Sequence, residues 1–159
     1  MAIALFMKVE GAPGESRNAK HKDWVDLESF HWGATQPSTM GVGGGGGAGK
    51  VSFHDLTCVA PVDKAYPALL VKCAGGEHIS KVLIAGSKAG GEEVEYFKIT
   101  LEDVIVTSVD VSGAQGAEVM VNYSFQAAKV KSEYSVQTDQ GGKGATSEFG
   151  WDIKQNKKV

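Results

Sequence analysis

The chain has 159 residues, with 16 Lys and Arg against 19 Asp and Glu and a formal net charge of −3 at pH 7. A chain of this length can bury about two thirds of its unfolded surface as one domain, residues 1–159, without a metal or a disulfide. The charge balance lacks the basic footprint of proteins that bind nucleic acid or anionic membranes, so the expected partners are proteins or small molecules.

The N-terminal segment predicts a strand rather than a secretory leader. Apolar residues alternate along residues 3–9, as they do in a strand with one buried face. No basic segment precedes them, and the charges of Lys8 and Glu10 come too early for the apolar core of a leader. No apolar stretch approaches the roughly 20 residues that span a bilayer. We therefore expect a chain made in soluble form, which a dedicated machine must export if it leaves the cell.

Two further strands change phase along their length. Val25 and Leu27 share one face of the first strand, whereas Trp32 lies on the other face. The same switch occurs within residues 51–58. A change of phase indicates a bulge or a bend, and small barrels turn their corners with such bends. The pattern favours a barrel over a flat sheet.

The segment between these strands, residues 36–50, is rich in glycine. Gly44 and Lys50 meet the spacing of a phosphate-binding P-loop, but Val51 stands where that motif has Ser or Thr. The motif also needs a helix after it, and a β-type run follows here. We interpret the segment as an extended loop, and a flexible connection with no other role remains the alternative.

One short helix is predicted. Pro67 is suited to a first helical position, residues 68–74 can continue the helix, and the two glycines that follow can stop it. Leu70 and Ala74 are expected to face the barrel.

Strands are expected again at residues 79–84, 94–111 and 118–128. The last of these shows the clearest alternation of apolar and polar residues, which predicts one buried and one solvated face. Residues 129–147 turn polar, with an exposed loop at 139–144. The expected fold is mainly β: a small antiparallel β-barrel with one short flanking α-helix.

No constellation of residues points to catalysis or to metal binding. Metal sites favour histidines at i, i+2 on a strand or i, i+4 on a helix, and the histidines here show neither spacing. His54 and Asp55 lie near Cys58 in the chain, but a single Cys in a strand is more often a buried side chain than a nucleophile. We expect no catalytic residue, no cofactor and no metal. The four histidines are His21, His31, His54 and His78.

A series of short segments runs in order along essentially the whole chain. These segments are Met7-Lys8-Val9-Glu10-Gly11, Pro13-Gly14-Glu15-Ser16, His31-Trp32-Gly33, residues 42–51, Val62-Asp63-Lys64-Ala65-Tyr66-Pro67, Val94-Glu95-Tyr96, residues 101–108 and Glu148-Phe149-Gly150-Trp151-Asp152-Ile153. Each is weak alone, but their order and spacing together are specific. In these segments the chain resembles the haemolysin co-regulated protein family, Hcp, of the bacterial type VI secretion system.

The resemblance implies a β-barrel that assembles into a hexameric ring with an open centre. Rings of this family stack into a tube, which a contractile sheath fires outward with a spike at its tip, and some members carry or chaperone effector proteins in the lumen. The implied partners are copies of the chain itself and the sheath, spike and effector proteins, with no nucleic acid and no direct membrane insertion. The implied location is the bacterial cytoplasm at synthesis, then the extracellular space or a target cell. The family is not known for chemistry of its own, so the resemblance implies no enzyme.

The resemblance also gives the extended loop a role, because in the family this connection is an arm that reaches toward a neighbouring ring. We therefore expect the loop to contact another ring or another subunit. The expected contact residues are Ser38, Thr39, Met40, Gly41, Val42, Gly43, Gly44, Gly45, Gly46, Gly47, Ala48, Gly49 and Lys50, and Pro67 is the expected helix start.

Two points stay open at this stage. Tyr66 stands where the family usually has Ser or Thr, so the capping of the predicted helix is in question. The alternative function is a monomeric β-barrel that binds a small ligand in its interior, and such a protein would have a monomer's mass and a ligand-dependent melting temperature.

Overall fold

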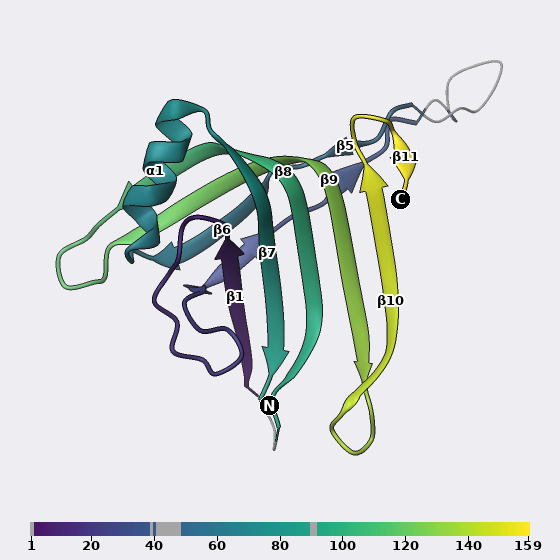
Figure 1. Ribbon diagram of the computed structural model, residues 1–159, viewed down its shortest axis with the longest axis horizontal. Coiled ribbons are helices and arrows are strands. Elements are labelled where there is room, and N and C mark those ends of the chain that lie inside the picture. The colour runs from purple at the N-terminus through teal and green to yellow at the C-terminus, as the bar shows by residue number, and fades with distance from the viewer. Residues whose placement is uncertain (1, 39, 41–48, 90–91) are drawn as a thin grey trace.

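The computed structural model describes residues 2–38, 40, 49–89 and 92–159. Within these residues every strand pair is antiparallel, and the strands form a nine-stranded sheet and a two-stranded one, with a single helix on the outside (Figure 1). In chain order the elements are β1 (Ile3–Val9), β2 (Val25–Leu27), β3 (Ser29–His31), β4 (Ala34–Thr35), β5 (Ser52–Phe53), β6 (Leu56–Pro61), α1 (Ala65–Gly75), β7 (His78–Lys88), β8 (Val94–Ser112), β9 (Met120–Gln137), β10 (Lys143–Asp152) and β11 (Lys157–Lys158).

The large sheet closes on itself because the segment that contains β2 and β3 pairs with β1 through β2 and with β6 through β3. The strand order is β11-β10-β9-β8-β7-β1-β2, and β6 pairs with both β9 and β3. Glu28 alone separates β2 from β3, and its N–H donates to the Val59 carbonyl of β6 at 2.8 Å. The predicted bend in this segment is thus confirmed, since the chain passes from β1 to β6 there. The predicted fold class, a mainly β antiparallel barrel with one short helix, is confirmed as well.

The β8–β9 hairpin belongs to the barrel at one end and forms a wing at the other. Residues 120–125 of β9 pair with β6, whereas residues 129–137 pair with β10. The prediction that this strand ends at residue 128 is therefore wrong. Its continuation pairs with β8 on one side and β10 on the other, and Val130 on its inner face is 2% exposed in the core.

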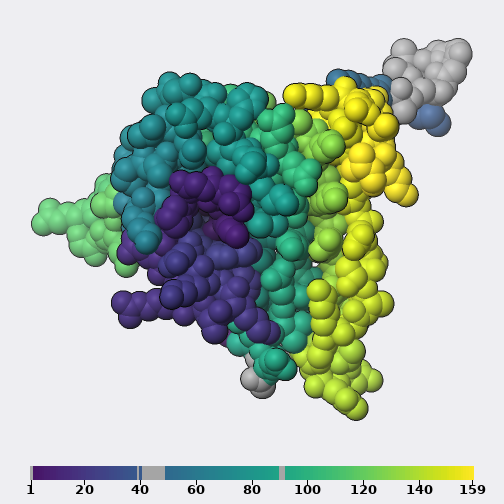
Figure 2. Space-filling model, in the orientation of Figure 1, coloured from purple at the N-terminus to yellow at the C-terminus, as the bar shows by residue number. Residues whose placement is uncertain are grey.

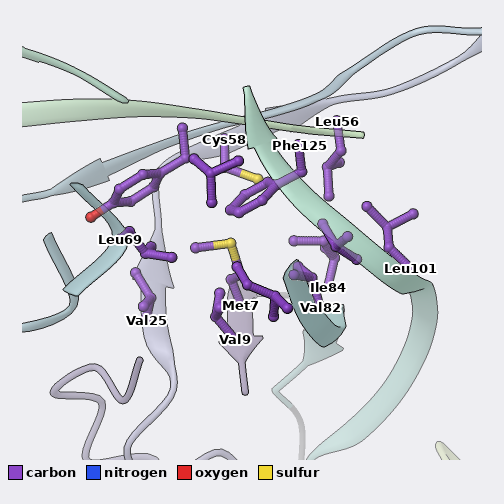
Figure 3. Close-up of a cluster of buried hydrophobic side chains, with 14 of the residues drawn as sticks. Met7, Val9, Val25, Leu56, Cys58, Leu69, Val82, Ile84, Leu101 and Phe125 are labelled. Atoms are coloured by element: carbon purple, nitrogen blue, oxygen red, sulfur yellow. The ribbon is translucent and has the colours of Figure 1, made fainter. Parts of the chain in front are cut away.

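The barrel interior is filled by side chains. Figure 3 shows buried residues from opposite walls, such as Met7 of β1, Leu56 of β6 and Phe125 of β9, pointing toward one another. The three are 0% exposed. Close packing of this kind leaves the barrel as a core rather than a channel.

The helix α1 begins at Ala65, two residues before the predicted start. Asp63 Oδ1 accepts a hydrogen bond from the Ala65 N–H at 2.9 Å, and Glu15 Oε2 accepts one from the Lys64 N–H at 2.8 Å. Two carboxylates therefore supply the acceptors that a Ser or Thr at Tyr66 would have offered. Pro67 is the third helical residue, and its missing N–H falls in the first turn, where it has no partner within the helix.

The helix also turns a different face to the barrel than predicted. Leu69 is 0% exposed and Leu70 is 40% exposed, while Ala74 is exposed, so the expectation for Leu70 and Ala74 is wrong. The buried line runs through Ala65 and Leu69, one turn apart. Because residues 68–71 are all apolar, the sequence alone gives no contrast from which to choose the face.

Candidate functional site

His54 and Cys58, which lie near each other in the chain, are in separate environments. Cys58 is 0% exposed in the core, and burial raises the pKa of its thiol far above the ordinary value of 9.0. His54 is exposed, and its ring stacks on that of His31 with a centroid separation of 6.3 Å. In the described part of the chain no group of three or more His, Cys, Asp or Glu side chains is placed to hold a metal ion. The buried, protonated Cys58 is a core residue rather than an activated nucleophile.

The described chain has no helix long and apolar enough to cross a membrane. The features that suggest a role are instead three surfaces: the stem of the glycine-rich loop, an aromatic groove beside it, and the open edge of β10.

The stem of the glycine-rich loop projects from one corner of the molecule (Figure 2). Strands β4 and β5 pair with each other there, outside the large sheet. Beyond them the Gly49 N–H donates to the Pro37 carbonyl at 3.3 Å, and a Cβ at Gly49 would lie 2.7 Å from Pro37 Cγ. The two sides of the loop therefore leave the barrel together, and their close approach requires a glycine at position 49.

The predicted contact residues divide between described and undescribed positions. Ser38, Met40, Gly49 and Lys50 are described and exposed, Met40 with 77% of its surface accessible. Thr39 and residues 41–48 lie outside the described residues. The chain after Lys50 enters strand β5, where a P-loop would have a helix.

An aromatic groove lies at the base of this stem. Trp32 stacks on Phe53 at a centroid separation of 5.7 Å, Phe53 lies 6.3 Å from Phe149, and Phe149 stacks on Trp151 at 6.5 Å. The rings line a pocket of about 510 Å³. Phe149 remains 42% exposed, and the buried indole N–H of Trp151 has no hydrogen-bond partner among the described residues. Open aromatic surfaces of this kind are typical of protein contacts.

The third surface is the free edge of β10. Strand β10 pairs with β9 along residues 143–152, but β11 covers only Trp151 and Asp152 on its other side. The Val159 N–H donates to the Gly150 carbonyl and extends this cover by one residue. On the side away from β9, residues 143–149 thus present backbone groups with no neighbouring strand in the described chain. An edge of this length invites pairing with another chain.

The sequence did not reveal the groove or the edge. Trp32 follows β3 and Trp151 lies in β10, and only the fold brings them to Phe53 of β5. The alternation of Phe149 and Trp151 along β10 was the available signal. It could not show that the face ends beside a groove.

An exposed charged cluster joins three elements near the barrel end of the sheet. His78 Nδ1 lies 2.7 Å from Asp103 Oδ1, and Lys154 Nζ lies 3.3 Å from Asp103 Oδ2. The hydrogen bond from His78, followed by that from Lys154, holds the pKa of the Asp103 carboxyl below its ordinary value. Solvent screens such exposed contacts, so they contribute little to stability.

Comparison with known proteins gives a consistent result. The family described as "Type VI secretion system effector, Hcp" matches residues 6–134. Protein hcp1 of Pseudomonas aeruginosa is 38% identical over 159 residues, 98% of each chain. The crystal structure of Hcp1 from Salmonella typhimurium superposes with a TM-score of 0.81 at 32% identity, covering 100% of both chains. The structure of a type six secretion system protein superposes with a TM-score of 0.94 at 27% identity, covering 99% of this chain and 100% of the other.

Proposed function

The chain belongs to the Hcp family, the secreted tube proteins of the type VI secretion system, and from that membership we propose that it forms hexameric rings that stack into the exported tube. The observation that carries this proposal is the family match over residues 6–134, which the 38% identity to Protein hcp1 over 98% of the chain extends. Residues 1–159 act as a single domain in this proposal, and the presence of β1 and β10 in one sheet supports that.

Ring formation gives the free edge of β10 a partner. In a closed ring each copy contributes two different surfaces, one to each neighbour, so an edge on one side can be covered by the opposite side of the next copy. The open residues 143–149 are suited to such a contact because an unpaired strand edge can pair with another chain, and the exposed Phe149 is suited to it because its ring gains from burial.

Ring stacking gives the glycine-rich loop a partner. Its stem, which ends at Pro37 on one side and at Gly49 on the other, leaves the barrel at a corner with both sides running outward together (Figure 1). We assign residues 38–50 to contact with a neighbouring ring or subunit. A lumen in the stacked rings would carry or chaperone effector proteins, and sheath and spike proteins of the same system complete the set of partners.

The alternative of a monomeric ligand-binding barrel gains no support from the core. Met7, Leu56 and Phe125 occupy the interior that a ligand would need. We propose a structural and transport role, with synthesis in the bacterial cytoplasm and delivery by the secretion system.

Light scattering after size exclusion tests the proposal. One chain has a mass of 16.7 kDa, so the proposal predicts a particle of six such masses. A single-chain mass that persists at high protein concentration would count against the ring and in favour of the monomeric alternative.

A further inference from the structure

The sheet face that points away from the core carries charges in rows that cross the strands. Directly opposite residues of antiparallel strands share a face, so the pairing register gives the order of each row. In one row Lys81 lies opposite Glu102, Glu102 opposite Lys129, Lys129 opposite Asp152, and Asp152 opposite Lys157. The sign of the charge alternates at every step from β7 to β11.

A second row, nearer the other end of the same strands, does not complete this pattern. Lys98 of β8 lies opposite Glu133 of β9, and Glu133 lies opposite Glu148 of β10. Like charges directly opposite each other destabilise a strand pair. The row then stops, because β10 has an open edge at Glu148, which is exposed. Lys131 shares this face two residues along β9. Among the described residues no ion pair forms within either row, so the two rows differ in the order of their charges.

The opposite side of the molecule carries cations without partners. The loop between β1 and β2 lies on the far side of the sheet from β10 (Figure 1). Arg17 and Lys22 of this loop are exposed and form no ion pair among the described residues. Lys20 differs from them, because its Nζ donates to the Glu93 carbonyl.

We propose that Glu148 at the open edge of β10 is paired, across each subunit boundary, with Arg17 and Lys22 of a second copy of this chain. The inference rests on the proposed ring, and it names the charged contact that fixes the order of neighbours around it. The neighbour's cations would follow Glu148 in the row Lys98, Glu133, Glu148. Lys157 follows Asp152 in the same way in the first row. The contact occurs once per boundary, so each ring contains it as many times as it has subunits.

A charge-swap experiment tests this pairing by native mass at low and moderate salt. Glu148→Lys places a third cation beside Arg17 and Lys22, and it is expected to raise the concentration needed for half-assembly by at least about tenfold. The triple variant Glu148→Lys, Arg17→Glu, Lys22→Glu restores opposite charges at every boundary and is expected to return assembly to the wild-type concentration. Higher salt is expected to shrink the difference between the single variant and wild type.

The matched control is Asp139→Lys, the same change of charge in the β9–β10 turn, which should leave ring assembly unchanged. Circular dichroism of each variant separates loss of folding from loss of assembly. Wild-type rings together with normal assembly of Glu148→Lys would overturn the pairing but leave the ring. The same holds if the folded triple variant fails to recover. A wild-type chain that stays monomeric would overturn the ring and the pairing with it.

Discussion

His21 is a buried residue whose two ring nitrogens both face acceptors. Nδ1 lies 3.0 Å from Asn18 Oδ1, and Nε2 lies 3.2 Å from Glu95 Oε2. Asn18 Oδ1 also accepts the backbone N–H groups of Lys20 and His21, which identifies it as the amide oxygen. A ring nitrogen that carries a hydrogen can donate it to the oxygen that it faces. The ring stacks on Phe6 at a centroid separation of 4.4 Å, so this side chain fastens the loop between β1 and β2 to the sheet.

Replacing His21 by Phe would keep the ring stack and remove both hydrogen bonds. We expect the free energy of unfolding to fall by about 1–3 kcal/mol, the range for a buried polar contact that loses one partner. Urea denaturation at a fixed chain concentration measures this loss. The matched control, His78→Phe, removes an exposed contact to Asp103 and should cost less than about 0.5 kcal/mol. Equal losses in the two variants would contradict the assignment.

Asp63 accepts a hydrogen bond at the start of α1, but its carboxylate is partly buried there. Burial raises the pKa of its carboxyl above the ordinary value of 3.8; the hydrogen bond from the Ala65 N–H opposes this, and the Glu15 and Asp26 carboxylates add to it. The folded chain therefore holds the Asp63 proton more tightly than the unfolded chain does. The contribution of this group to stability thus increases as pH falls through its folded-state pKa and levels off below 3.8.

Asp63→Asn should flatten that dependence, because the amide oxygen still accepts from the Ala65 N–H and no charge is buried. At pH 7 we expect its free energy of unfolding to match or exceed that of the wild type. Asp63→Ala, which leaves the N–H without its acceptor, should lose about 1 kcal/mol. Denaturation curves between about pH 3 and 7 give both comparisons. An Asn variant with the same pH slope as the wild type would show that another group is responsible.

The sequence could predict the alternation at residue scale but not these contacts. Residues 121, 123 and 125 are buried as their alternation predicts. His21 and Glu95 are 74 residues apart, and no local pattern links them. The carboxylate of Glu15 is also remote in the sequence: it accepts the Lys64 N–H at the start of α1 from the loop after β1.

At the scale of elements, the two neighbouring leucines of α1 differ in burial and should differ in their contribution to stability. Leu69→Ala removes a side chain that is 0% exposed and should lower the free energy of unfolding by about 2–5 kcal/mol. Leu70→Ala removes a neighbour that is 40% exposed and should cost less than about 1 kcal/mol. The comparison by urea denaturation is direct, since the two substitutions are the same. A larger loss at Leu70 would mean that the helix presents the originally predicted face.

Elements were predictable where phase or turn residues marked them. The phase changes at residues 27–30 and 53–56 are the points where the chain changes its strand partner. Residues 129–137 were not recognised as strand because polar residues outnumber Val130, Tyr134 and Val136 there, and their pairing with β8 and β10 depends on distant residues. The residue pattern alone underestimates the length of a strand that is paired with a neighbouring strand on both sides.

At the scale of the whole molecule, the glycine-rich loop should matter for stacking and not for ring formation. Deleting residues 43–47 should leave the ring mass unchanged and abolish longer assemblies, because the shortened loop cannot reach a neighbouring ring. Sedimentation of assemblies at high protein concentration measures the loss. A same-length control, with these five glycines replaced by alternating Ser and Gly, should still stack. Normal stacking of the deletion variant would mean that the loop is a simple connection.

The assembly surfaces were only partly predictable. The loop stood out because glycine rarely occurs in long runs within packed structure. The β10 edge and the aromatic groove depend on which strand ends the sheet, and that is decided by pairings such as Asp152 with Lys157 that no local pattern displays.

The most direct test of the central claim is electron microscopy of the purified protein over a range of concentrations. The account predicts rings with an open centre and six-fold symmetry, which stack end to end as the concentration rises. Compact particles of single-chain size, without a central opening at any concentration, would contradict it.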